Sequence, residues 1–137
     1  MNAVSDNNRT KVSQVDIDRE FERAEQMLAD AEKAADVGIS KATIVNRLYY
    51  ACFHAAQAAL YARGTDPQSH GQVQILLGKE LIKSGDIPRE LGRFLNDMET
   101  YRRRVDYGSG GVERSTDELI VETRRFLEVM EEFTDEE

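Results

Sequence analysis

The sequence of 137 residues contains one cysteine, two prolines, no tryptophan and only 7% aromatic residues. Because Cys52 stands alone within an apolar segment, it cannot form an internal disulfide and is expected to be a packed thiol. The low glycine, proline and aromatic content argues against a turn-rich sandwich or barrel. No apolar run reaches the roughly 18 residues of a membrane span, because Arg47 and His54 interrupt the best candidate. These absences favour one helical, cytoplasmic domain with no membrane contact.

The charge is distributed unevenly along the chain. The formal net charge is -8, and residues 113–137 alone carry ten acidic residues against three arginines, a net charge of -7. The preceding residues are therefore close to neutral, at -1. An acidic protein is a poor nonspecific ligand for nucleic acid, since phosphate contacts need clustered lysine and arginine. A local basic site is still compatible with this balance.

Apolar residues recur at steps of three and four along five stretches, which predicts five helices. The second stretch, with its body over residues 44–62, is apolar on nearly every side and is expected to be the buried central helix. No strand-like alternation, fixed repeat or phosphate-binding glycine loop is present, so the sequence predicts an all-α antiparallel bundle. The five stretches are bounded by these pairs of residues: Asp16 and Gly38, Ser40 and Gly64, Ser69 and Gly85, Pro88 and Gly108, Ser115 and Phe133.

Local signals set the expected ends of these helices and of the domain. Ser40 is a candidate N-cap, and Ser115 followed by Glu118 is a candidate capping box. Gly64 is a candidate helix stop. We divide the chain into a flexible N-terminal tail over residues 1–14, a helical domain over residues 15–133 and an acidic end over residues 134–137.

Three polar residues on the central helix share one face. Arg47, Tyr50 and His54 are spaced three and four residues apart on an otherwise apolar element. They could satisfy one another and nearby backbone carbonyls while fixing the packing of the helix. Alternatively, His54 could titrate near neutral pH and Arg47 could hold an anion, with both facing a cleft or dimer groove. The sequence leaves both interpretations open.

A second polar group ends the fourth predicted helix. Residues 101–107 read YRRRVDY, and Arg102 and Asp106 lie one helical turn apart. The three consecutive arginines spread over about 200° of the helix, and cations near a helix C-terminus are favourable in any case. The local positive surplus is modest and suits a small anionic ligand better than a long duplex. No cysteine, histidine or carboxylate cluster has metal-site spacing, so neither a metal nor a cofactor is expected.

The string NRLYYACFHAA at residues 46–56 resembles the Arg-x-x-Tyr-Tyr-Ala-x-Phe-His segment of small prokaryotic HEPN proteins. Ser-His-Gly at residues 69–71 and Gly-Lys-Glu at residues 78–80 match in order. RRRVDY at residues 102–107 is similar to the family's Arg-x-x-Ala-Asp-Tyr ending. The resemblance implies an antiparallel four-helix core with an additional short helix. It also implies a homodimer, often encoded beside a minimal nucleotidyltransferase as a toxin and antitoxin pair.

Many HEPN proteins are metal-independent ribonucleases with an Arg-x(4-6)-His motif, in which histidine moves a proton and arginine steadies the phosphate. Arg102 matches the motif arginine, whereas Asp106 and Tyr107 stand where the histidine is expected. The resemblance therefore gives Arg102, Asp106 and Tyr107 as catalytic candidates. Tyr107 also corresponds to a tyrosine that a partner transferase nucleotidylates in some family toxins. The candidates for RNA or nucleotide binding are Arg47, Tyr50, His54 and Arg103.

Two other functions fit the same sequence. The protein could be a noncatalytic interaction or nucleotide-binding module that binds a nucleotidyltransferase or another protein through its helical faces. It could also bind a small ligand inside the bundle, where several alanines leave room beside the central helix. These alanines are Ala51, Ala55, Ala56, Ala58 and Ala59.

Overall fold

The computed structural model describes residues 12–137, and helices account for most of this range. Four long helices and one shorter helical segment follow one another, with no strand in the described range, so the predicted all-α class is confirmed. Most of the predicted N-terminal tail, residues 1–11, lies outside the described residues. The elements are α2 (Gln14–Asp36), α3 (Lys41–Arg63), α4 (His70–Leu76), the π-helix η1 (Leu77–Ile82), α5 (Arg89–Tyr107) and α6 (Thr116–Glu136).

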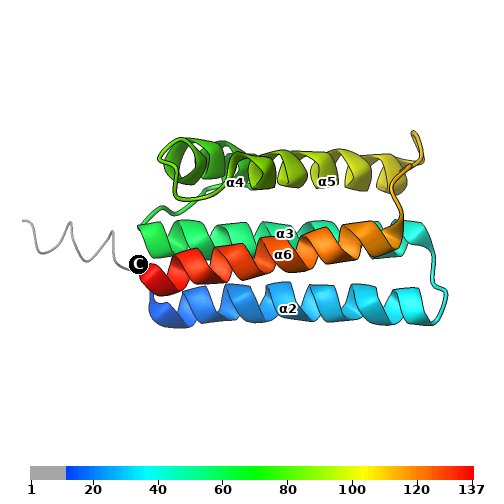
Figure 1. Cartoon of the computed structure of the whole chain (residues 1–137), viewed down its shortest axis with the longest axis horizontal. Helices are drawn as coiled ribbons and strands as arrows, with labels where there is room; N and C mark the ends of the chain where they lie inside the picture. Colours follow the sequence, from blue (N-terminus) through cyan, green and yellow to red (C-terminus); the bar gives the residue numbers. More distant parts are fainter. Residues whose placement is uncertain (1–11) are drawn as a thin grey trace, which may run out of the picture.

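Helix α3 is the centre of the bundle. It contacts α2, α6 and α5, and also the shorter segments α4 and η1. In Figure 1, α2 lies on one side of α3, whereas α4 and α5 form an outer layer on the opposite side. The prediction of a buried central helix is confirmed, because a helix with neighbours on all sides must be apolar on nearly all sides.

Small and large apolar residues together let α3 occupy this position. Leu48 and Leu60 have no exposed surface, and each contributes about 1.5–3 kcal/mol by leaving water. The five alanines considered above as a possible ligand space are also fully buried, which allows the neighbouring helices to approach closely. Ser40 caps the helix by accepting a hydrogen bond from the Thr43 amide, and Gly64 ends it in the left-handed conformation at φ 90°. Both predicted end signals are therefore confirmed.

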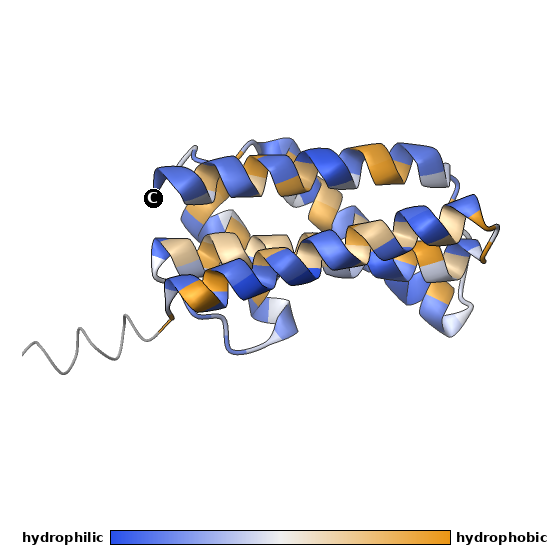
Figure 2. Cartoon of the chain, turned by 90° about the horizontal axis from the view of Figure 1, so that it is seen from below, coloured by the Kyte–Doolittle hydropathy of each residue, from blue (hydrophilic) through white to orange (hydrophobic). Residues whose placement is uncertain are grey.

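Helices α2 and α6 are amphipathic and turn their apolar sides towards α3. Hydrophobic and hydrophilic residues accordingly alternate along the helices in Figure 2. The complete capping box is at Ser13 and Asp16, at the start of α2. At α6 only half of the predicted box forms, because Ser115 accepts from the Glu118 amide while the Glu118 carboxylate pairs with Arg114. Helix α6 continues to Glu136, into the segment predicted as a separate acidic end.

The third predicted helix is divided between α4 and η1. In η1 the amide of Lys83 donates to the carbonyl of Gly78, five residues back, at 2.9 Å. This wider turn occurs where the segment crosses α5 closely. A Cβ atom on Gly92 of α5 would lie 2.4 Å from Ile82 Cδ1, so only glycine fits there without displacing Ile82. Ile75, an apolar residue of this stretch, is exposed.

Arg63, the last residue of α3, connects three segments at one end of the bundle. Its guanidinium donates to the Asp86 and Glu137 carboxylates and to the Glu80 carbonyl. It also lies 5.3 Å from the centre of the Phe133 ring. The loop before α5 and the end of α6 are thus tied to α3. None of the helices in residues 12–137 is both long and apolar enough to cross a bilayer.

Candidate functional site

Arg102 is the centre of a polar cluster where the last turns of α5 face the first half of α3. Its guanidinium donates through Nη2 to Glu99 Oε2 at 2.9 Å and through Nη1 to Asp106 Oδ2 at 3.0 Å. Glu99 and Asp106 stand three residues before and four residues after Arg102, so the helical repeat places all three side chains on one face. The Arg102 side chain is only 17% exposed, which shields these charges from water.

Helix α3 extends this cluster. Asn46 donates to Asp106 Oδ1 at 3.4 Å, and Arg47 donates to the Asn46 side-chain oxygen at 3.3 Å. On α5, Arg103 Nη2 lies 3.4 Å from Glu99 Oε1. One chain of polar contacts therefore joins both helices, and we call it the Arg102 network. Its members, in order, are Arg47, Asn46, Asp106, Arg102, Glu99 and Arg103.

The floor beneath Arg102 is aromatic. Its guanidinium carbon lies 5.0 Å from the centre of the Tyr49 ring, a cation–π distance. Tyr50 meets Tyr49 edge to face at 4.9 Å. Burial, with the nearby Glu99 carboxylate, raises the pKa of Tyr49 to about 12. Tyr49 is therefore neutral and presents an aromatic surface to Arg102. The ionised groups of the network lie on the other side of the Arg102 guanidinium.

The charge of Arg102 is secure in this setting. Partial burial opposes the charged form, but the hydrogen bonds to Glu99 and Asp106 outweigh it and raise the pKa of Arg102. Its Nε is buried and has no hydrogen-bond partner among the described residues. Buried donors normally find a partner, so this inward-facing Nε is an exception within the network. The three arginines of the network exceed its two carboxylates by one positive charge, which suits an anion.

The structure brings together four of the predicted site residues, Arg47, Arg102, Arg103 and Asp106. Sequence reasoning missed Asn46, Glu99 and Tyr49. Glu99 could have been found from its spacing of three and four residues to Arg102 and Arg103. Asn46 and Tyr49 lie inside the family-like string, but only the packing of α3 on α5 shows which side chains face Arg102.

His54 lies in a different network, between α3 and α2. Its Nδ1 is 2.8 Å from Oε1 of Glu20, which is only 5% exposed. Gln57 donates to the same oxygen at 2.9 Å, and Arg23 donates to Oε2 at 2.7 Å. Burial opposes ionisation of Glu20, but the bond and charge of His54, with Arg23 and Gln57, hold its pKa below the usual range. The structure does not bring His54 to the Arg102 network. We call this second set the Glu20 network.

Two aromatic residues near the site are more exposed. Tyr107, the last residue of α5, is 78% exposed. His70 starts α4 and stacks on Phe53 at 4.1 Å, with Tyr50 edge-on at 6.0 Å. Ser69 provides the helix cap, so His70 has a packing role at the surface. Cys52 is fully buried, and burial raises the pKa of its thiol to about 12, which makes it unreactive at neutral pH.

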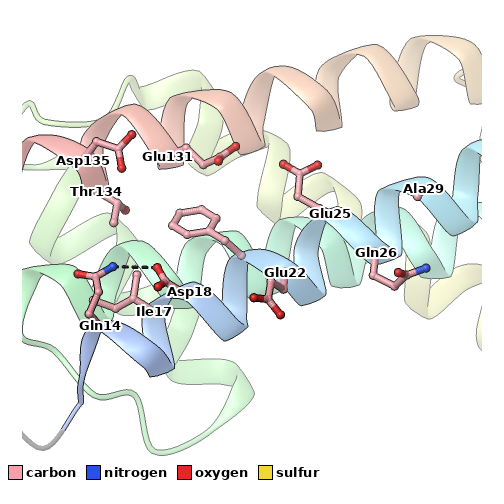
Figure 3. A pocket seen from close by; sticks show the side chains of 11 residues that line it. Gln14, Ile17, Asp18, Glu22, Glu25, Gln26, Ala29, Glu131, Thr134 and Asp135 are labelled. Atoms are coloured by element: carbon pink, nitrogen blue, oxygen red, sulfur yellow. Dashed lines mark hydrogen bonds between the residues drawn. The ribbon is translucent and has the colours of Figure 1, made fainter.

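A groove between α2 and α6 has a volume of about 850 Å³. Figure 3 shows carboxylates from both helices around it, with Gln14 hydrogen-bonded to Asp18 at one end. Burial, and then the Glu25 carboxylate, raise the pKa of Glu131 in its wall. None of the predicted site residues lines this groove. Within residues 12–137, no three histidine, cysteine or acidic side chains are placed to hold a metal ion.

The family model of the HEPN domain matches residues 18–134. The chain belongs to the HEPN domain family. Both the resemblance and the four-helix bundle with a short additional helical segment are therefore confirmed. Arg102 and Asp106 of this HEPN protein are thus held together at the end of α5, in the segment that resembles the family motif.

Relatives of this HEPN protein include the UPF0332 protein glr0978 of Gloeobacter violaceus. It is 36% identical over 116 residues, which cover 82% of this chain and 91% of that protein. The UPF0332 protein of Thermotoga maritima is 33% identical over 94 residues, covering 67% of this chain and 71% of that protein. The Methanocaldococcus jannaschii protein named "Putative toxin MJ0142" is 28% identical over 105 residues, which cover 72% of this chain and 69% of that protein.

Proposed function

We propose that this HEPN protein is the toxin-type component of a pair with a minimal nucleotidyltransferase and that it acts as a metal-independent endoribonuclease. The observation that carries the proposal is the Arg102 network, which holds a shielded guanidinium and a carboxylate 3.0 Å apart. The name of the M. jannaschii relative supports the toxin assignment. The same network also suits the binding of RNA or a nucleotide without cleavage, which is the second candidate function.

In the proposed reaction, an RNA phosphate replaces a carboxylate on Arg102. The freed Asp106 carboxylate accepts the proton of the ribose 2′-hydroxyl as that oxygen attacks phosphorus. The bond from phosphorus to the 5′-oxygen breaks, and water protonates the leaving oxygen. The products are a 2′,3′-cyclic phosphate and a free 5′-hydroxyl. Arg102 and Arg103 stabilise the negative charge that builds on the phosphate oxygens. Arg47, through Asn46, orients Asp106.

The test is incubation of the purified protein with a mixed RNA pool in EDTA. Wild type is expected to cleave, whereas Asp106→Asn and Arg102→Lys should each lose about 100-fold or more in rate. Lysine keeps the charge of Arg102 but not its two-pronged geometry. Asp97→Asn and Arg125→Lys, which change exposed residues outside the network, are the matched controls. Circular dichroism checks that every variant is folded.

The result separates the two candidates. Cleavage by wild type and both controls, but by neither network variant, supports the ribonuclease. Tight RNA binding that is lost in Arg102→Lys, without cleavage by any folded form, supports the binding module. Equal cleavage by all five proteins would point to a contaminating nuclease and would sink the assignment of Arg102 and Asp106.

Tyr107 is the proposed acceptor of a nucleotidyl group from the partner transferase. Its position at the end of α5 and its 78% exposure support this role, because a transferase must reach the hydroxyl. The tyrosine oxygen would attack the α-phosphate of the nucleotide, and pyrophosphate would leave. Mixing the protein with the transferase and ATP should add one adenylyl group to the peptide that contains Tyr107. Tyr107→Phe should remain unmodified, and Tyr50→Phe, which alters a less exposed ring, should be modified normally.

We also propose that the protein is a homodimer. A dimer that places two Arg102 networks beside one groove would double the positive surplus available to RNA. Light scattering of the purified chain should then give twice the mass of one chain. A monomer that still cleaves RNA would refute the dimeric groove but leave the assignment of Arg102 intact.

A further inference from the structure

One face of α5 carries polar residues without a single carboxylate. Six residues follow one another along this helix at steps of four, three, four, three and four. At about 100° per residue, all six fall within about 40° of one line along the helix. We call this line the α5 stripe. It consists of Arg89, Arg93, Asn96, Thr100, Arg103 and Tyr107.

The α5 stripe lies opposite the buried side of the helix, and its first half borders η1, where Arg89, Arg93 and Asn96 line a hollow with Gly78 and Ile82. The buried residues of α5, Leu91, Phe94, Leu95 and Met98, lie on the opposite side of the helix. The helix packs against α3, η1 and α4, and Figure 1 shows it in the outer layer of the molecule. An outward face is normally a mixture of both charges, and this chain has a net charge of -8. A cationic stripe without acids is therefore an unusual surface for this protein.

The cations of the stripe are available to a ligand. Arg89 and Arg93 have no carboxylate within 4.0 Å among the described residues, and both are exposed. Arg103 shares Glu99 with Arg102 and is still 58% exposed. Several arginines elsewhere are ion-paired with carboxylates, which reduces their attraction for other anions. They are Arg19, Arg23, Arg63, Arg114 and Arg124.

The length and the end of the stripe indicate what it binds. The nineteen residues of α5 span eighteen helical rises, about 27 Å, enough for a short single strand of about four nucleotides. Three arginines contact phosphates, and the exposed Tyr107 ring offers a stacking surface for an unpaired base. The stripe also reaches the Arg102 network, because Arg103 belongs to both.

We propose that the α5 stripe binds single-stranded RNA and leads it to the Arg102 network. This inference rests on the proposed function, since it specifies the form of RNA and the path by which it enters. Phosphates contact Arg89 and Arg93 first, and the base at the far end stacks on Tyr107. Asn96 and Thr100 lie between the cations, and the nearest carboxylates on α5, those of Asp97 and Glu99, flank the stripe on either side.

The first experiment measures binding alone. A fluorescein-labelled single-stranded RNA of twelve nucleotides, 2′-O-methylated so that it cannot be cleaved, is titrated by fluorescence anisotropy at several salt concentrations. Arg89→Gln/Arg93→Gln should weaken binding about tenfold or more and reduce the salt slope by about 1.4, since each phosphate contact contributes about 0.7. Tyr107→Ala should weaken binding about fivefold or more.

The matched control is Lys33→Gln/Arg125→Gln, which removes the same charge from exposed positions on α2 and α6. Equal loss of affinity in this control and in the stripe variant would mean that only net charge matters, and it would overturn the proposal. Tighter binding of a duplex than of the single strand would overturn it as well. A change in oligomeric state in the stripe variant, with RNA affinity unchanged, would show that a second copy occupies the face.

A second experiment distinguishes this inference from the proposed ribonuclease. If both hold, Arg89→Gln/Arg93→Gln raises KM for RNA cleavage and leaves kcat unchanged. Binding that depends on the stripe, without cleavage by any variant, would support RNA binding by the α5 stripe and refute the ribonuclease proposal. Cleavage with the same KM in wild type and the stripe variant would support the ribonuclease proposal and refute RNA binding by the α5 stripe.

Discussion

The Glu20 network and the Arg102 network lie on the same helix, α3, but they satisfy their polar groups to different degrees. In the Glu20 network, three donors at 2.7–2.9 Å saturate one buried carboxylate. In the Arg102 network, the hydrogen bond from Asn46 on α3 to Asp106 on α5 is 3.4 Å long, and the bond from Arg47 to Asn46 within α3 is 3.3 Å long. The Arg102 Nε has no partner in the described part of the chain. A saturated, buried carboxylate such as that of Glu20 fixes the packing of helices, whereas the partly exposed carboxylates of Glu99 and Asp106 can be replaced on Arg102 by a ligand.

The largest effect should come from breaking the Glu20 network. Glu20→Ala leaves the donors on His54 and Gln57 without an acceptor, so we expect it to lower the free energy of unfolding by about 3 kcal/mol. Urea denaturation followed by circular dichroism measures this loss. Glu22→Ala, two residues away and exposed, should change it by less than about 0.5 kcal/mol. Similar losses in both variants would show that the Glu20 network has no special structural role.

The Arg102 network should be much less important for stability. Asp106→Asn keeps one acceptor oxygen and alters an ion pair whose carboxylate is 32% exposed, so the expected loss is below about 1 kcal/mol. The same urea denaturation experiment measures this change in the free energy of unfolding. A loss as large as that of Glu20→Ala would mean that both networks are structural, and the contrast between them would disappear.

Acid should weaken the Glu20 network selectively. Because the pKa of Glu20 is lowered in the folded protein, its ionised form contributes stability above the pKa of the unfolded chain, about 4.3. That contribution is lost as pH falls through the folded pKa. The difference in unfolding free energy between wild type and Glu20→Gln should therefore be constant near neutral pH and shrink in acid. A difference that is independent of pH down to pH 3 would contradict the assigned ionisation.

The smallest effect should arise in the groove between α2 and α6, where carboxylates crowd one another. The pKa of Glu131 is raised, so its ionised form costs stability above the folded pKa, and the cost vanishes as pH falls towards the unfolded value. Glu131→Gln should raise the unfolding free energy by a few tenths of a kcal/mol at pH 7 and have no effect in acid. Glu132→Gln, at an exposed position on the same helix, should be neutral. Thermal unfolding at both pH values provides the comparison.

The sequence predicted the helices and one of the two networks in part, for definite physical reasons. Helix ends at Ser40, Gly64 and Gly108 depend on local geometry, and the pairing of Arg102 with Asp106 depends only on the helical repeat. The pairing of His54 with Glu20 joins residues 34 positions apart, so it depends on how α2 is rotated against α3. Residue spacing within one helix does not determine how that helix is rotated against its neighbour. For the same reason, the contact between Asn46 and Asp106 was not predicted.

The place of Tyr107 has a consequence for regulation. It is exposed at the end of α5, four residues after Arg103, one of the arginines that we assign to RNA. A nucleotidyl group on its hydroxyl would bring one phosphate, one ribose and one base to that spot. The modified residue would then be a covalent imitation of the substrate, competing within the same molecule at a very high effective concentration. Inhibition by this route would require no change of fold, because the attached nucleotide would permanently occupy the end of the α5 stripe at Tyr107.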